Sequence, residues 1–202
     1  MNAHHPIRIA FALCLGTLLS GCGSAILHES WTSEQASLNQ EPSLNFIDPC
    51  TEMENNWSPE WIEFERQVLE LTNQHRAQGA DCNTKGVFPP AGPVSWNSKL
   101  ACAARAHSQD MGERGFFDHI SPEGTTPGER AQTSGYIYQT VGENIAAGQS
   151  TPAAVVEGWL GSDGHCANMM NDRFTELGVG HTFAPEDVYR FYWTQVFGRP
   201  RI

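Results

Sequence analysis

The chain has 202 residues, of which 12 are lysine or arginine and 23 are aspartate or glutamate. The acidic balance argues against nucleic acid as a partner, because phosphate binding requires a basic face. It favours solubility but says little about the fold. The length suits one globular domain with a single hydrophobic core, preceded by an N-terminal segment of different composition.

That N-terminal segment has the form of an export signal. Arg8 precedes an apolar run over residues 9–19, and small residues follow up to Cys22. The run is too short to span a bilayer comfortably, which favours a cleaved signal over residues 1–21. The letters LSGC at 19–22 resemble the bacterial lipobox, so we expect Cys22 to carry a lipid that anchors the protein in the cell envelope. The alternative is an ordinary cleaved signal.

Residues 22–56 are predicted to form a tether between the anchor and the domain. They are rich in Ser, Asn, Gln and acidic residues, and their apolar residues follow no fixed period. Cys50 favours an alternative in which residues 46–50 pack onto the domain. The globular domain itself is expected over residues 57–202.

The cysteines beyond the signal predict disulfides. An even number in an exported chain indicates two bridges, and the spacing leaves all three pairings open. A metal cluster is disfavoured because no Cys-x-x-Cys pair is present. These cysteines are Cys50, Cys82, Cys102 and Cys166.

Three helices are expected in the first half of the domain. Ser58 and the following proline open the first helix, and Gly79 ends it. Asn97 caps the second, whose alanines permit close approach of a neighbour and whose His107 is interpreted as a packed core residue. A short third helix is predicted from Thr126 to Ser134.

A fourth helix lies between two polar stretches. Thr151 is a natural N-cap followed by a proline, and Gly161 with the pair at 163–164 is expected to end the helix. His165 would then lie on a loop just past the helix, and Glu143 in the segment that leads into it. Loops on rigid supports often carry binding groups, although a turn residue and a surface histidine are the plainer interpretation.

Two strands are expected near the C-terminus, over residues 176–183 and 189–197, joined by a turn at 184–187. The second strand, YRFYWTQVF, is apolar on both faces, which predicts a central position covered by helices on each side. With a further strand leading into Glu143, the pattern indicates an α+β fold: a three-layer α-β-α sandwich with a small antiparallel sheet.

Six motifs now stand in order along the domain. They are HSQDM (107–111), FFDHISPEG (116–124), GENIA (142–146), GWLGSDGHCANMM (158–170), LGVG (177–180) and YWTQVFG (192–198). In this order and spacing the chain resembles the CAP superfamily of cysteine-rich secretory, antigen 5 and pathogenesis-related proteins, and most of all its bacterial SCP-like branch. The resemblance covers nearly the whole folded part and implies the same sandwich.

The resemblance also implies a cleft that holds two histidines and two acidic groups. His119 matches the first histidine, Glu143 the glutamate and His165 the second histidine. The fourth position, a glutamate in many eukaryotic members, falls on Ser162, so this site has one carboxylate fewer. Glu157, more than a turn earlier on the same helix, could substitute only if that helix were placed differently.

Bacterial relatives further imply that Cys82 pairs with Cys166, which leaves Cys50 for Cys102. A disulfide at Cys166 would fix the backbone next to His165.

Two imidazoles and a carboxylate are good ligands for zinc or another divalent metal. The resemblance implies zinc binding through His119 and His165, with Glu143 either as a ligand or as the group that orients a histidine. A small or lipid-like molecule is a further possible ligand of the cleft.

Two other functions remain open at this point. One is a metal-assisted hydrolase with Glu143 as general base, although the chain has no His-Glu-x-x-His helix. A serine nucleophile at Ser162 is disfavoured because the nucleophile-elbow pattern is absent. The other is an interaction module of the envelope, in which the polar groups merely satisfy one another by hydrogen bonds.

Overall fold

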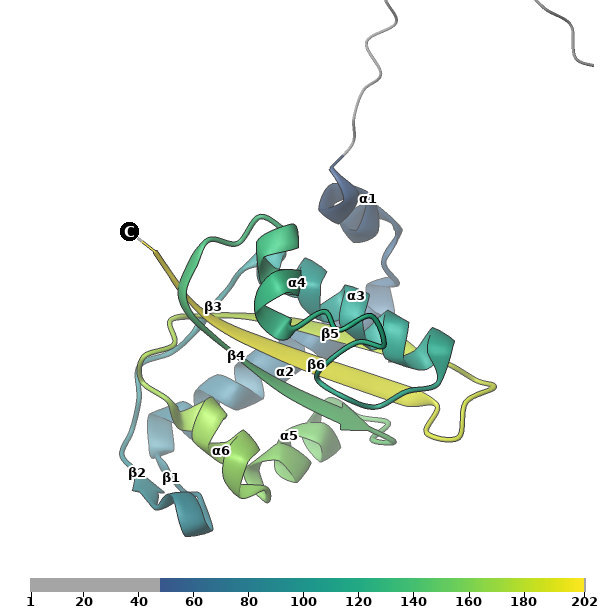
Figure 1. Ribbon diagram of the computed structural model, residues 1–202. Helices are drawn as coiled ribbons and strands as arrows, with labels where there is room; N and C mark the ends of the chain where they lie inside the picture. Colours follow the sequence, from purple (N-terminus) through teal and green to yellow (C-terminus); the bar gives the residue numbers. More distant parts are fainter. Residues whose placement is uncertain (1–47, 202) are drawn as a thin grey trace, which may run out of the picture. The chain divides into compact units, whose positions relative to one another are not determined.

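The computed structural model describes residues 48–201, and its elements are labelled in Figure 1. The predicted signal, Cys22 and the tether up to residue 47 lie outside this range. Within it, no helix combines the length and apolarity that crossing a membrane requires.

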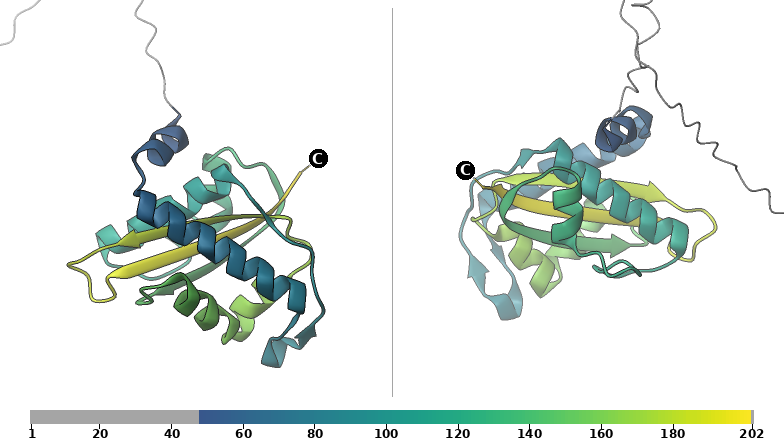
Figure 2. Two further views of the ribbon diagram at one scale, coloured as in Figure 1. Left: turned by 180° about the vertical axis from the view of Figure 1, so that it is seen from behind. Right: turned by 45° about the horizontal axis from the view of Figure 1, so that its top comes forward.

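A three-layer α-β-α sandwich forms the domain, as predicted. Its sheet has the strand order β3-β5-β6-β4, in which β6 runs antiparallel to both β5 and β4 and the short β3 runs parallel to β5. Helices α3 and α4 cover one face, and α2, α5 and α6 cover the other (Figure 2). The elements are α1 (Pro49–Asn56), α2 (Pro59–Gln78), β1 (Ala80–Asp81), the 3-10 helix η2 (Asn83–Lys85), β2 (Val87–Phe88), β3 (Ser95–Trp96), α3 (Ser98–Arg114), α4 (Pro127–Thr133), β4 (Tyr138–Ala147), α5 (Pro152–Leu160), α6 (Asp163–Met170), β5 (Glu176–Phe183) and β6 (Phe191–Pro200).

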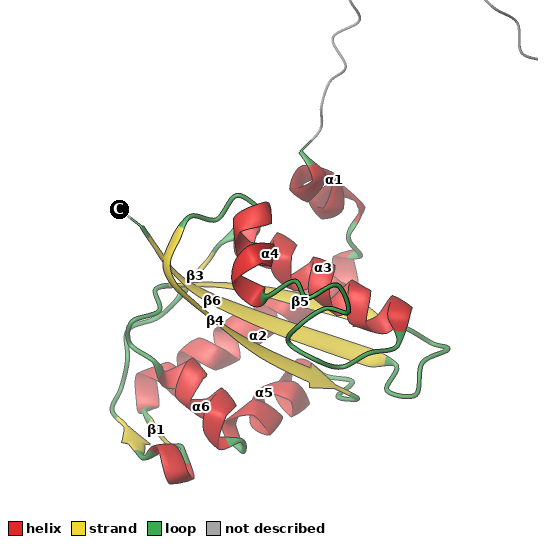
Figure 3. Ribbon diagram, viewed as in Figure 1, coloured by secondary structure: helices red, strands yellow, loops and turns green. Residues whose placement is uncertain are grey.

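The strand β6 lies at the centre of the sheet because both of its faces are apolar (Figure 3). Trp193 and Phe197 pack against the side of α2 and α5, whereas Tyr192 and Val196 contact the side of α3 and α4. The strand begins two residues later than predicted, since Arg190 adopts a left-handed backbone conformation (φ 64°) that an extended strand does not allow.

Helix α3 lies directly on β5, as its alanines predicted. A side chain added at Gly178 would collide with the backbone of Ala101, and one added at Gly180 would collide with the backbone of Ala104. Small residues on both surfaces therefore set the short distance between the helix and the sheet.

The predicted helix starts are confirmed for three helices. The side chain of Asn97 accepts hydrogen bonds at the start of α3, and Thr151 does so at the start of α5. Thr126 forms a full capping box with Glu129 at the start of α4. Ser58 occupies the capping position of α2, but its hydroxyl makes no capping hydrogen bond.

Both disulfides that the resemblance implied are present, Cys50–Cys102 and Cys82–Cys166. The first links α1 to α3, so the last residues of the segment assigned to the tether, Pro49–Asn56, form a helix bonded covalently to the domain. The second links the loop after β1 to α6.

The prediction that His165 lies on a loop was wrong, because it belongs to the first turn of α6. The chain breaks only briefly after α5: Ser162 takes an extended conformation, and Asp163 then begins the new helix. An acidic residue in the first turn favours a helix start, and Gly164 is tolerated there. The helix is stabilised by burial of one face, which consists of Cys166, Met169 and Met170.

Candidate functional site

Glu143 is the centre of the site. It lies in the middle of β4, opposite Val196 of β6, and its side chain is only 2% exposed. His119 Nδ1 lies 2.9 Å from Oε1, and Arg130 Nη2 lies 3.1 Å from Oε1 and 2.9 Å from Oε2. Two positively polarised partners thus surround the buried carboxylate, which compensates for its loss of hydration.

Arg130, on α4, holds the loop that carries His119. Its guanidinium donates to the carbonyl oxygen of His119 at 2.8 Å and to that of Thr125 at 2.9 Å, in addition to Glu143. One side chain therefore joins two points of the loop to β4. The sequence analysis missed Arg130, because no local pattern shows that α4 turns this residue toward the sheet.

His119 presents one ring nitrogen to the outside. Its side chain is 45% exposed, and the hydrogen bond from Nδ1 to the Glu143 carboxylate fixes the ring orientation. Since a neutral imidazole that donates through Nδ1 keeps its lone pair on Nε2, that atom is free to bind a ligand. No described residue forms a hydrogen bond with it.

His107 lies behind Glu143 as a buried residue of α3, which confirms its interpretation as a core histidine. Its Nε2 is 3.0 Å from the carbonyl oxygen of Asp118 and 3.9 Å from Glu143 Oε1. Burial lowers the pKa of His107, which outweighs the opposing effect of Glu143. The neutral ring therefore donates to Asp118 and supports the loop next to His119.

Helix α6 is attached to β4 through two asparagines. Asn144 donates to the carbonyl oxygen of His165 at 3.1 Å, and Asn168 donates to that of Glu143 at 3.1 Å. A third hydrogen bond, 3.0 Å long, joins the two asparagine side chains. These bonds fix the backbone of His165 relative to the strand that carries Glu143.

His165 is half-buried, and two causes lower its pKa: burial first, and then the charge of His119. His119 is therefore close enough to His165 for its charge to act on the His165 ring. His165 stays neutral, and able to bind a metal ion, at a lower pH than an exposed histidine does.

Ser162 lies beside His165 in a hollow of about 280 Å³. Phe117 and Tyr189 form part of its wall, while His119 and Glu143 are not among its lining residues. Glu157 is exposed on α5 and does not line it either. The resemblance assigns four residues to the cleft. Two of them, His119 and Glu143, are hydrogen-bonded to each other. The other two, His165 and Ser162, line the hollow.

The donor set is sparse. The described residues contain no group of three or more His, Cys, Asp or Glu side chains arranged to hold a metal ion.

The model of the cysteine-rich secretory protein family (CAP) matches residues 69–197. The uncharacterized protein YkwD of Bacillus subtilis is 39% identical over 134 residues, which cover 66% of this chain and 46% of that protein. The uncharacterized membrane protein YlbC of the same organism is 32% identical over 151 residues, which cover 75% of this chain and 39% of that protein. The chain thus spans less than half the length of these relatives.

Solved structures show the same architecture. An extracellular SCP-domain protein of Bacillus anthracis superposes with a TM-score of 0.58 at 34% identity, covering 71% of this chain and 44% of that one. An outer surface protein of Borrelia burgdorferi gives a TM-score of 0.56 at 18% identity, with coverage of 71% and 95%, and supports the fold alone. The family match and the identity to these relatives show that the chain belongs to the cysteine-rich secretory protein (CAP) family.

Proposed function

We propose that this protein is an exported CAP-domain binding module whose cleft holds a divalent metal ion, with zinc as the first candidate. The ligands are His119 and His165. The observation that carries the proposal is the hydrogen bond from the exposed imidazole of His119 to the buried carboxylate of Glu143.

This pair resembles the carboxylate–histidine arrangement that supports metal-binding histidines in proteins. Glu143 orients the ring from behind, while Arg130 holds both carboxylate oxygens, so Glu143 acts as a support and not as a ligand. A site with two protein ligands and water in the remaining positions has modest affinity for zinc. A bound ion would act as a Lewis acid on a ligand that enters the cleft.

The hydrolase alternative has less support. A general base must reach the water or group that it deprotonates, but the Glu143 side chain is 2% exposed and its oxygens already accept hydrogen bonds from Arg130 and His119. A small or lipid-like ligand remains an alternative occupant of the hollow beside His165.

The proposed location outside the cytoplasm rests on the signal-like N-terminus and on the relatives, which include an extracellular protein and a membrane protein. A lipid on Cys22 would then anchor the protein. If so, the Cys22→Ala variant leaves the membrane fraction of the cell. Retention of that variant in the membrane would contradict the anchor.

Zinc titration of the purified protein, followed by isothermal calorimetry, tests the proposed metal site. We expect His119→Ala and His165→Ala each to weaken binding at least tenfold, since each removes one of two ligands. His75→Ala is the matched control, because it removes a half-buried histidine of α2 that lies outside the site.

Absence of zinc binding by the folded wild type would reject the proposal and leave the interaction module. Turnover of a peptide or ester that Glu143→Gln abolishes would instead support the hydrolase. Binding that survives both histidine substitutions would place the metal elsewhere.

A further inference from the structure

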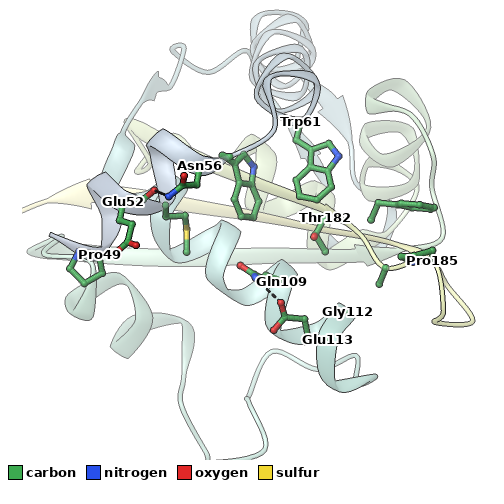
Figure 4. A pocket seen from close by; sticks show the side chains of 13 residues that line it. Pro49, Glu52, Asn56, Trp61, Gln109, Gly112, Glu113, Thr182 and Pro185 are labelled. Carbon is green, nitrogen blue, oxygen red and sulfur yellow. Dashed lines mark hydrogen bonds between the residues drawn. The ribbon is translucent and has the colours of Figure 1, made fainter. Parts of the chain in front are cut away.

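A groove of the domain lies away from the histidine site and takes no part in the proposed metal binding. It has a volume of about 710 Å³ and lies between α1, α3 and the end of β5 (Figure 4). We propose that this groove binds a small organic cation, with an ammonium or guanidinium group on an apolar body.

The groove has an aromatic wall. Trp61 is half-buried, and its ring lies 5.3 Å from that of Trp57 in an edge-to-face arrangement. Trp57 is fixed from the inner side, because its indole nitrogen donates to Glu65 and the guanidinium of Arg105 lies over its ring. Met53 adds a flexible thioether. Such a surface suits an apolar body. Arg105 already lies over the ring of Trp57, and Arg190 lies over that of Phe183. Trp61 is therefore the lining tryptophan that can attract a cation through its ring.

The charge of the groove is negative. Among the described residues that line it, Glu52 on α1 and Glu113 on α3 carry a charge, and both are exposed. The neutral Gln109 donates to Glu113 at 2.6 Å, which orients the carboxylate without neutralising it. The nearest basic residue along α3, Arg114, is paired with Asp110 and Glu123. An anionic ligand would therefore be repelled, and a cation attracted.

The size and ends of the groove favour a small molecule over a continuous chain. Its volume lies within the range of roughly 300–1,000 Å³ that is typical of ligand pockets. Pro49 lies at one end and Pro185 at the other, as Figure 4 shows.

The Cys50–Cys102 disulfide makes the groove a preformed site. It bonds α1 to α3, and these two helices carry the two carboxylates. Without this bond α1 would have to be positioned by few contacts, since none of its residues is buried. A preformed pocket loses less entropy when it binds a ligand.

A matched series of three probes tests the proposal on the full exported chain, by calorimetry in low salt. Phenylbutylamine, phenylbutanol and phenylbutyrate share one apolar body but carry a positive, a neutral and a negative head. We expect the amine to bind most tightly and the carboxylate most weakly. Added salt should weaken binding of the amine.

Variants then locate the binding. Glu52→Gln and Glu113→Gln should each weaken amine binding about two- to fivefold, the range for exposed charge pairs, and should leave phenylbutanol unaffected. Glu157→Gln, which neutralises an exposed glutamate of α5 far from the lining, is the matched control and should change nothing. Joint replacement of Cys50 and Cys102 by serine should abolish binding of all three probes.

The proposal fails if no probe binds at millimolar concentration, or if the amine and the alcohol bind equally well. It also fails if both glutamate variants bind the amine as the wild type does. Because the histidines take no part in this groove, His119→Ala should leave amine binding intact, so zinc binding and amine binding can fail independently.

Discussion

Two buried glutamates of this domain, Glu65 and Glu143, have similar hydrogen-bond partners, but these partners differ in their exposure to solvent. Glu65 accepts hydrogen bonds from Arg105, from the indole of Trp57 and from the backbone of His181, and its side chain is fully buried. Glu143 accepts from Arg130 and from His119, whose own side chain is 45% exposed.

The difference lies in the last partner of each carboxylate. The partners of Glu65 are all buried, so this cluster holds α2, α3 and β5 together and, through Trp57, also supports the wall of the groove beside α1. The cluster of Glu143 ends in an imidazole that faces solvent, so it can transmit the orientation of the carboxylate to a ligand. A buried ion pair by itself is therefore no sign of function, and of these two pairs only the one at Glu143 has a partner that a ligand could reach.

The largest loss of stability is expected at the hydrogen-bond cluster of Glu65. Glu65→Gln should lower the free energy of unfolding by about 3–5 kcal/mol, because it leaves the charge of Arg105 buried without its partner. Urea denaturation measures this, and Glu63→Gln, an exposed neighbour on α2, should stay within about 0.5 kcal/mol of the wild type. Equal effects of the two substitutions would contradict the structural role of Glu65.

The next largest effect is expected in the pH dependence of stability that arises from His181. Burial among aromatic rings lowers the pKa of His181 to about 4, against an ordinary value of 6.5. The unfolded chain therefore binds this proton more tightly, so the stability that the neutral His181 contributes is fully present above pH 6.5 and is lost as the pH drops from there to about 4. The loss amounts to at most about 3 kcal/mol.

His181→Phe keeps an aromatic ring and removes the proton site. The difference in unfolding free energy between this variant and the wild type should thus shift in favour of the variant between pH 7 and pH 4. A difference that stays constant over this range would show that His181 does not titrate on unfolding.

At the hydrogen-bond cluster of Glu143 we expect a smaller loss of stability and a clear loss of zinc affinity. Glu143→Gln should cost about 1–3 kcal/mol, because Arg130 loses its charged partner but keeps two carbonyl acceptors. Zinc affinity should fall about tenfold, as is usual when a carboxylate that orients a metal-binding histidine is removed. Unchanged zinc affinity in calorimetry would show that Glu143 does not support the proposed metal site.

The smallest change in stability is expected for His119→Ala. Since this ring is nearly half exposed and Arg130 still holds Glu143, the unfolding free energy should change by less than about 1 kcal/mol. Thermal denaturation checks this expectation. A loss as large as that at Glu65 would show that His119 is a structural residue and would remove the contrast between the two clusters.

The sequence predicted the elements whose signals are local. Asn97, Thr126 and Thr151 each start the expected helix, and the apolar residues on both faces of the predicted strand 189–197 indicated the central strand. The start of α6 was missed because an Asp-Gly pair usually marks a turn, whereas here burial of Met169 and Met170 stabilises a helix.

The partners of Glu143 could be identified only from the folded structure. Arg130 is 13 residues away in sequence and His107 is 36 away, and both lie on other elements than Glu143, so no local periodicity could indicate these contacts. The helix α1 was missed for another reason: its polar composition resembles a linker, and its covalent bond to α3 supplies an attachment that composition does not reveal.

The Cys82–Cys166 disulfide makes the position of His165 depend on the redox state of the compartment. It bonds the residue directly after His165 to the loop beyond β1, where Asn83 also donates to Asp163 at the start of α6. Disulfides persist in oxidising compartments and are rare in the cytosol. A reduced copy of the chain would therefore hold His165 less firmly than an oxidised one, so the proposed metal site would reach its full affinity only in an oxidising compartment.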